Sequence, residues 1–239
     1  MLHDRMDDRT GLLRRCAVAL CLALLSALAP GSGGVAMESG QGVVALPQPD
    51  LQGEVAVERA LASRRSVREF AAEPLSLPVV SQLLWAAQGI TDPTGLRTAP
   101  SAGALYPLEV YLVVGAVTGV AAGVYRYEPQ RHGLVAGTAG DARAAVARAA
   151  LGQDWVAEAP VVVVLAAVYQ RTARKYGERA PRYVHIEVRH AAQNVYLQAA
   201  ALGLGTTMVG AFRDEELARV LGLPGQVKPV GILPVGKPR

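Results

Sequence analysis

The stretch APSAGALYPLE at residues 99–109 is the most informative part of this sequence. It begins with Pro100 and the small residues Ser101, Ala102 and Gly103, and it runs into the apolar segment EVYLVVG at residues 109–115. The β-branched and aromatic composition of segment 109–115 predicts a strand. Small residues let a ligand approach the backbone closely, and we call this stretch loop 99–109.

Two basic segments lie far from this loop in the sequence. Residues 64–68 read RRSVR, and the sequence ends in KPR at residues 237–239. Phosphate binding uses Arg or Lys together with a hydroxyl and backbone N–H groups at a helix end, and these segments supply such groups. With loop 99–109 and residues 210–211 they could bind one anionic planar cofactor. Taken alone, residues 64–68 also suit a solvated basic helix end, and residues 237–239 a frayed tail.

The order and spacing of these segments resemble the nitroreductase-like flavoproteins over residues 55–239. Loop 99–109 is similar, more narrowly, to the signature of the SagB/ThcOx-type azoline dehydrogenases. KYGER at residues 175–179 and HAAQN at residues 190–194 resemble the same branch. The resemblance implies an α+β, nitroreductase-like fold in which helices flank a central, mostly antiparallel sheet. It also implies FMN as the cofactor and a domain-intertwined homodimer.

The resemblance also implies roles for individual residues. The implied cofactor-binding residues are Arg64, Arg65, Ser66, Arg68, Pro100, Ser101, Ala102, Gly103, Gly210, Ala211, Lys237 and Arg239. The basic segments would hold the phosphate and ribityl chain, loop 99–109 would lie beside the ring, and a backbone N–H at residue 210 or 211 would point at N5. Arg68 would approach the N1/O2 edge, where a cation stabilises reduced flavin. Ala104 stands where generic nitroreductases tend to have an Asn that contacts the flavin.

Lys175 and Tyr176 are the catalytic pair that the resemblance implies, because both residue types can exchange a proton while hydride passes to N5. Alternatively, residues 175–179 form a solvated polar turn, with Tyr176 packed against the domain. The implied activity is hydride transfer between flavin N5 and a small organic substrate, as in a SagB/ThcOx-type dehydrogenase. The alternatives are NAD(P)H-dependent reduction of a nitro, quinone or enone compound, a catalytically silent flavin-binding protein, and a globular domain without flavin.

Hydrophobic periodicity predicts an α+β arrangement of elements. We expect helices at residues 55–66, 77–88, 141–151, 182–202 and 214–221, and strands at residues 109–115, 123–127, 160–168 and 227–235. The apolar run at residues 160–168 suits a buried central strand. The Ala-rich helix at residues 182–202 suits a position buried on most sides, within the fold or at a dimer interface.

The N-terminal part of the sequence has the pattern of a secretory signal. Arg14 and Arg15 precede an apolar run of 14 residues, which is shorter than the roughly 20 residues that a membrane-spanning helix needs. We expect residues 1–36 to be a signal peptide, residues 37–53 a linker or extended arm, and residues 54–239 the domain. The protein would then be exported to the periplasm, or be anchored to a membrane through an uncleaved N-terminal segment.

Charge and motif content exclude several kinds of site. Removing the four Arg and three Asp of residues 1–36 from the 24 basic and 20 acidic residues leaves 20 and 17, a net charge of +3 that does not indicate nucleic-acid binding. Both Cys also lie in residues 1–36. His185 and His190 are about 140° apart around a helix, which argues against a shared metal. The expected partners are a small-molecule substrate, a second copy of the chain and NAD(P)H or another electron donor, with no membrane span after residue 36.

Overall fold

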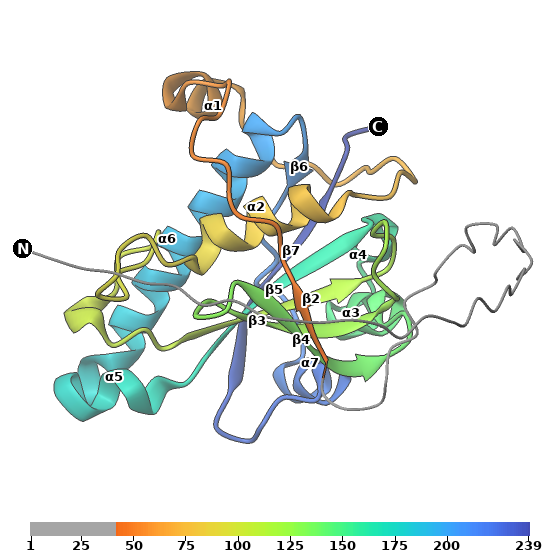
Figure 1. Cartoon of the computed structure of the whole chain (residues 1–239). Helices are drawn as coiled ribbons and strands as arrows, with labels where there is room; N and C mark the ends of the chain where they lie inside the picture. The colour runs from red at the N-terminus through yellow and green to blue at the C-terminus, as the bar shows by residue number, and fades with distance from the viewer. Residues whose placement is uncertain (1–41) are drawn as a thin grey trace, which may run out of the picture. The chain divides into compact units, whose positions relative to one another are not determined.

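A seven-stranded sheet runs through the computed structural model, which describes residues 42–239 (Figure 1). Its strands are β1 Val43–Ala45, β2 Leu108–Val114, β3 Gly123–Glu128, β4 Gly133–Ala139, β5 Val161–Ala167, β6 Gly205–Thr206 and β7 Lys228–Gly236. They lie in the order β1-β4-β3-β2-β5-β7-β6, and every neighbouring pair is antiparallel. The predicted antiparallel sheet is therefore confirmed.

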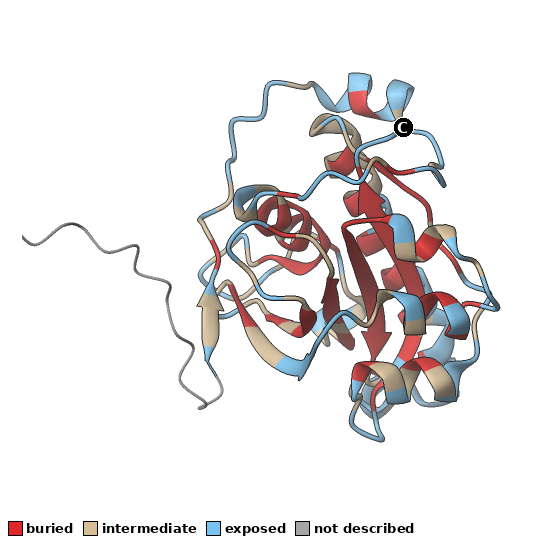
Figure 2. Ribbon diagram, turned by 90° about the vertical axis from the view of Figure 1, so that its right-hand side faces the viewer, coloured by how far each residue is buried: buried red, intermediate tan, exposed pale blue. Residues whose placement is uncertain are grey.

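Helices cover both faces of the sheet. They are α1 Val57–Ser63, α2 Leu77–Gln88, α3 Arg143–Ala149, α4 Trp155–Glu158, α5 Tyr169–Tyr176, α6 Ala180–Ala201 and α7 Asp214–Leu221. Alternate side chains of β5 point to opposite faces, as the pleat of a strand requires. Val163 and Leu165 pack in the core with α2 and α6, and Val162 and Val164 in the core with α3, α4 and α7. All seven residues of β5 are buried, as predicted for a central strand (Figure 2).

Several elements differ from the prediction. Strand β4 and helix α5 were not predicted, and residues 205–206 form only a short strand. The segment assigned to a linker also takes part in the fold, since β1 pairs with β4 and the Asp50 amide donates to the Gln82 side chain at 2.9 Å. Residues 43–50 thus belong to the fold, although the predicted domain started at residue 54.

The predicted signal peptide lies outside the described residues. None of the helices within residues 42–239 combines the length and the apolar character that a membrane span requires.

Candidate functional site

Backbone pairing brings the two predicted basic segments together. Ser66 forms a parallel bridge with Thr206, the Ala71 amide donates to the Lys237 carbonyl at 2.9 Å, and the Arg239 amide donates to the Glu69 carbonyl at 3.2 Å. The C-terminal residues therefore run beside residues 66–71, although about 170 positions separate them in the sequence. We call Arg64, Ser66, Arg68, Lys237 and Arg239 the basic cluster.

Aromatic and acidic residues surround the cations of the basic cluster. The Arg64 guanidinium lies 5.5 Å from the centre of the Tyr196 ring, and the Arg68 guanidinium 5.7 Å from the centre of the Trp155 ring. Lys237 pairs with Glu73 at 3.1 Å, and Arg239 pairs with Glu158 at 3.6 Å. These carboxylates hold the cations in place through exposed pairs, which are weak enough for an anionic ligand to displace.

Arg65 was predicted to bind the cofactor, but its side chain has other partners in the structure. Arg65 donates to the carbonyl groups of Ala62 and Arg64, so its guanidinium binds backbone oxygens at the end of α1.

Thr206 was not predicted as a site residue. Its backbone pairs with that of Ser66, and its hydroxyl is buried with no hydrogen-bond partner among the described residues. An unpaired buried hydroxyl on a strand that pairs with Ser66 fits a site for a phosphate group.

The segment around helix α4 contacts both residue 211 and the basic cluster. The Ala211 carbonyl accepts a hydrogen bond of 3.4 Å from the side chain of Gln153, just before α4. This helix also carries Trp155 and Glu158, which contact Arg68 and Arg239. A β-carbon built on Gly210 would meet no atom within 4 Å, so there is open space beside this backbone.

The predicted catalytic pair lies against loop 99–109. A β-carbon built on Gly103 would lie 3.0 Å from Nζ of Lys175 and 3.0 Å from the hydroxyl oxygen of Tyr176. Gly103 also has a φ of +63°, in the left-handed region that favours glycine. Inside the loop, the Tyr106 amide donates to the Ser101 hydroxyl at 2.9 Å. We call residues 100–103, Lys175 and Tyr176 the loop cluster.

The two clusters lie at different points along helix α6. Tyr196, under Arg64, is near the C-terminal end of this helix, while the Ser101 hydroxyl lies against Glu187 and the Tyr176 ring packs 4.5 Å from that of Tyr183. Figure 1 likewise shows α1 and α5 at opposite ends of α6. Nine residues of helix separate Glu187 from Tyr196, a rise of about 14 Å. The described residues show no direct contact between the two clusters.

Glu187 is a further ionisable residue beside the loop cluster. Its side chain is 2% exposed, and one carboxyl oxygen has no hydrogen-bond partner among residues 42–239. Burial raises the pKa of Glu187 to about 7, against the opposing effects of the Ser101 hydroxyl and the Arg97 guanidinium. A single Glu in an otherwise apolar stripe of the helix was the signal that could have identified it.

Comparison with known proteins identifies the family. The profile of the Nitroreductase family matches residues 61–237. A protein of Methanocaldococcus jannaschii, provisionally described as a nitroreductase, is 49% identical over 189 residues, which cover 79% of this chain and 94% of the relative. The chain belongs to the nitroreductase family. It is an oxidoreductase of this family, as the resemblance of the sequence implied.

Solved nitroreductase structures share the fold. A Ralstonia eutropha JMP134 protein described provisionally as a nitroreductase superposes with a TM-score of 0.74 at 31% identity, covering 85% of this chain and 93% of its own. The NADPH:FMN oxidoreductase of Vibrio harveyi, complexed with NAD+, superposes with a TM-score of 0.55 at 20% identity, covering 76% and 68%. The nitroreductase-like fold is therefore confirmed.

The predicted localisation is wrong. The prediction of an exported, periplasmic protein, with a membrane-anchored alternative, rested on residues 1–36. The family match begins at residue 61, and the 49% identical relative is matched over 94% of its own length. These matches are to nitroreductases and give no positive indication of export.

Proposed function

We propose that this nitroreductase-family protein transfers hydride between N5 of FMN and a small organic substrate, with Lys175 and Tyr176 exchanging the accompanying proton. The observation that carries the proposal is the approach of both side-chain tips to Gly103. Residues that are far apart in the sequence thereby place an amine and a phenol against the loop expected beside the flavin. Both groups can donate or accept a proton in a transition state.

The basic cluster is the proposed binding site of the FMN phosphate and ribityl chain. Its cations and the Ser66 hydroxyl are donors of the kind that phosphate oxygens accept, and the unpaired Thr206 hydroxyl adds another. Arg68 would lie at the N1/O2 edge, where positive charge stabilises the reduced cofactor. The open space beside Gly210 would let a backbone N–H approach N5.

FMN, when bound, supplies a hydride acceptor and donor at N5. Oxidation of the substrate breaks a C–H bond, whose electron pair leaves with the hydride, while Lys175 or Tyr176 takes the proton lost from the neighbouring atom. Reduction reverses both transfers, so the same pair gives the proton back. Gly103 would leave room for the substrate beside the pair, because a β-carbon at this position would lie 3.0 Å from both side-chain tips.

This proposed function has two versions, which differ in the direction of hydride transfer. The similarity of loop 99–109 and residues 175–179 to SagB/ThcOx-type enzymes favours substrate dehydrogenation. The relative at 49% identity, provisionally described as a nitroreductase, favours reduction of nitro, quinone or enone compounds with NAD(P)H. We propose dehydrogenation of the substrate as the main function and NAD(P)H-driven reduction as the alternative.

The test measures flavin binding and turnover separately. Arg68→Ala, or deletion of Arg239, should weaken FMN binding by about tenfold or more, because each removes a charged hydrogen-bond donor. Lys175→Met and Tyr176→Phe should keep the flavin spectrum but slow flavin reduction or reoxidation by about 10²-fold, the range of general acid–base catalysis. Visible absorbance reports binding, and stopped-flow mixing with NADH, NADPH, a nitroaromatic and a quinone reports turnover.

Two exposed arginines provide matched controls. Arg59→Ala in α1 and Arg174→Met in α5 change the charge near each cluster, and both should leave FMN binding and turnover within about twofold. A protein that cannot be reconstituted with FMN overturns the proposal. Bound flavin that no donor reduces and no acceptor reoxidises would instead show the catalytically silent flavin-binding protein.

A further inference from the structure

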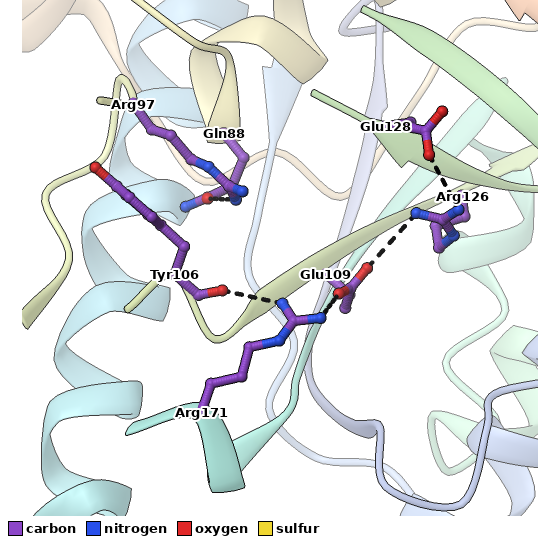
Figure 3. A network of polar contacts seen from close by, with 7 residues as sticks. All are labelled: Gln88, Arg97, Tyr106, Glu109, Arg126, Glu128 and Arg171. Carbon is purple, nitrogen blue, oxygen red and sulfur yellow. Dashed lines mark hydrogen bonds and ion pairs between the residues drawn. The ribbon is translucent and has the colours of Figure 1, made fainter. Parts of the chain in front are cut away.

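A polar cavity lies beside strands β2 and β3 of the sheet. It has a volume of about 270 Å³, and its polar walls include Gln88, Arg97, Glu109, Arg126 and Arg171. These residues come from the end of α2, the segment before β2, strands β2 and β3, and α5 (Figure 3). None of them belongs to the basic cluster or the loop cluster.

Positive charge exceeds negative charge in the cavity wall. Three guanidinium groups face a single carboxylate, that of Glu109. Arg171 holds this carboxylate by a direct hydrogen bond and also donates to the Tyr106 carbonyl at 3.0 Å. Arg126 is held only loosely, at 3.9 Å from Glu109 and 3.6 Å from Glu128 (Figure 3). The Arg126 fork is therefore available to a stronger anionic partner.

Arg97 and Gln88 leave hydrogen-bond donors unused. Arg97 donates to the Gln88 side-chain oxygen at 2.7 Å, and its guanidinium lies 4.5 Å from the centre of the Tyr106 ring. Arg97 forms no ion pair within residues 42–239, although it lies close enough to the buried Glu187 carboxyl to oppose the rise of that group's pKa, and its Nε is buried without an acceptor. Gln88 is fully buried, and its Nε2 also has no partner among these residues. Unused buried donors are costly unless a ligand or water accepts from them.

We propose that this cavity binds a small carboxylate. The planar guanidinium fork of Arg126 matches the geometry of a carboxylate, which can accept two parallel hydrogen bonds, and Arg97 adds a second guanidinium to the wall of the same cavity. Glu109 does not repel such a ligand strongly, because Arg171 already neutralises it. The volume of the cavity suits a short organic acid and is too small for a nucleotide. The site is independent of the flavin, so it does not rest on the proposed function.

The experiment is a thermal-shift and calorimetric titration of the full chain with acetate and with succinate at pH 7.5. Sodium chloride keeps the ionic strength constant. The titration is done with FMN at saturation, to fill the basic cluster, and again without FMN. We expect saturable stabilisation by at least one of the two acids. Arg126→Gln should weaken this binding by about tenfold or more, because it removes a charge-assisted pair from a partly exposed residue whose loss the fold tolerates.

Arg131→Gln is the matched control. Arg131 also pairs with Glu128, at 3.4 Å, but it does not line the cavity, so its loss should change the affinity by less than about twofold. The proposal is overturned if neither acid binds saturably above the chloride control, or if both Arg variants weaken binding equally. Binding of inorganic phosphate without either carboxylate would also overturn it.

Discussion

At the scale of single residues, burial has its clearest chemical effect on Glu187. This carboxyl sits on α6 among apolar residues, next to Ser101 of the loop cluster, and its pKa is raised from 4.5 to about 7 mainly by burial. Because the folded-state pKa lies above the unfolded one, the native protein holds more protons than the unfolded chain between about pH 4.5 and pH 7. The contribution of Glu187 to stability is therefore fully present below this window and is lost as the pH rises through it.

Replacing Glu187 with Gln should remove this pH dependence. The free energy of unfolding of the wild type relative to Glu187→Gln should fall by up to about 3 kcal/mol between pH 4.5 and pH 8, since each unit of pKa shift corresponds to about 1.4 kcal/mol. Urea unfolding at half-unit steps of pH measures the difference. Glu58→Gln, on an exposed position of α1, should give a curve parallel to the wild type. Parallel curves for Glu187→Gln as well would contradict the raised pKa.

At the scale of elements, His132 ties the segment after β1 to the rest of the fold. The imidazole Nε2 lies 2.9 Å from the Pro47 carbonyl and 2.7 Å from the Ser81 hydroxyl of α2, and Nδ1 lies 2.9 Å from the Tyr127 hydroxyl of β3. With the proton on Nε2, the ring donates to Pro47 and accepts from Tyr127. One side chain thus joins an N-terminal segment, a helix and a strand.

His132 also makes the stability of this junction depend on pH. Burial lowers its pKa below 6.5, against the opposing effect of the hydrogen bond to Pro47, so the folded state favours the neutral ring. Its contribution to stability is therefore present above pH 6.5 and is lost as the pH falls through the lowered value. His132→Gln should reduce the free energy of unfolding by about 1–3 kcal/mol at pH 7.5, and by less at pH 5.

Chemical denaturation at the two pH values measures this loss, and an exposed histidine supplies the control. The exposed His185 contacts the ring and the hydroxyl of Tyr169, the latter at 2.8 Å, so His185→Gln should change the free energy by less than about 0.5 kcal/mol. An equal loss at both pH values for His132→Gln would show that the ring does not change its charge in this range.

The elements that the sequence predicted correctly are those with strong local signals. Helices α2 and α7 have the predicted bounds, because Pro78 starts the first and a Gly follows each. Strand β4 was missed because GLVAGTA has two glycines and becomes a strand only by pairing with β1 and β3. Helix α5 was missed because its composition is polar, and one face of it packs on α6 only in the folded chain.

At the scale of the whole molecule, the sequence predicted which segments carry candidate site residues, but not that these segments form two separate clusters. Local motifs named the segments of both clusters, and these clusters now appear as two groups about 14 Å apart along α6. Spatial neighbours such as Thr206 and Glu187 carry no motif and were found only in the fold. The polar cavity was missed for the same reason, since its three arginines come from three separate segments.

Exposed apolar side chains mark a surface where a second copy of the chain could pack, so that the basic cluster and the loop cluster would together form one site. Val57 and Leu61 lie one turn apart on α1 and are 56% and 52% exposed, and Val57 lines a cavity of about 350 Å³ between α1, α2 and α6. Ile186 on α6 is 45% exposed within one chain, and the composition of this helix had suggested burial within the fold or at a dimer interface. A second copy that packed here would cover these residues and could bring its loop cluster to the basic cluster of the first.

A mixed dimer tests this arrangement directly. One chain carries Arg68→Ala and the other Lys175→Met, and different affinity tags on the two chains isolate the mixed species after co-expression. If each site combines the basic cluster of one chain with the loop cluster of its partner, one of the two sites is intact. The mixed dimer should then have about half of the wild-type activity, while each parent variant stays low. If both clusters of a site came from one chain, every site in the mixed dimer would be damaged and no activity would return. Light scattering of the wild type is the companion measurement, since a monomer would remove the basis for a shared site.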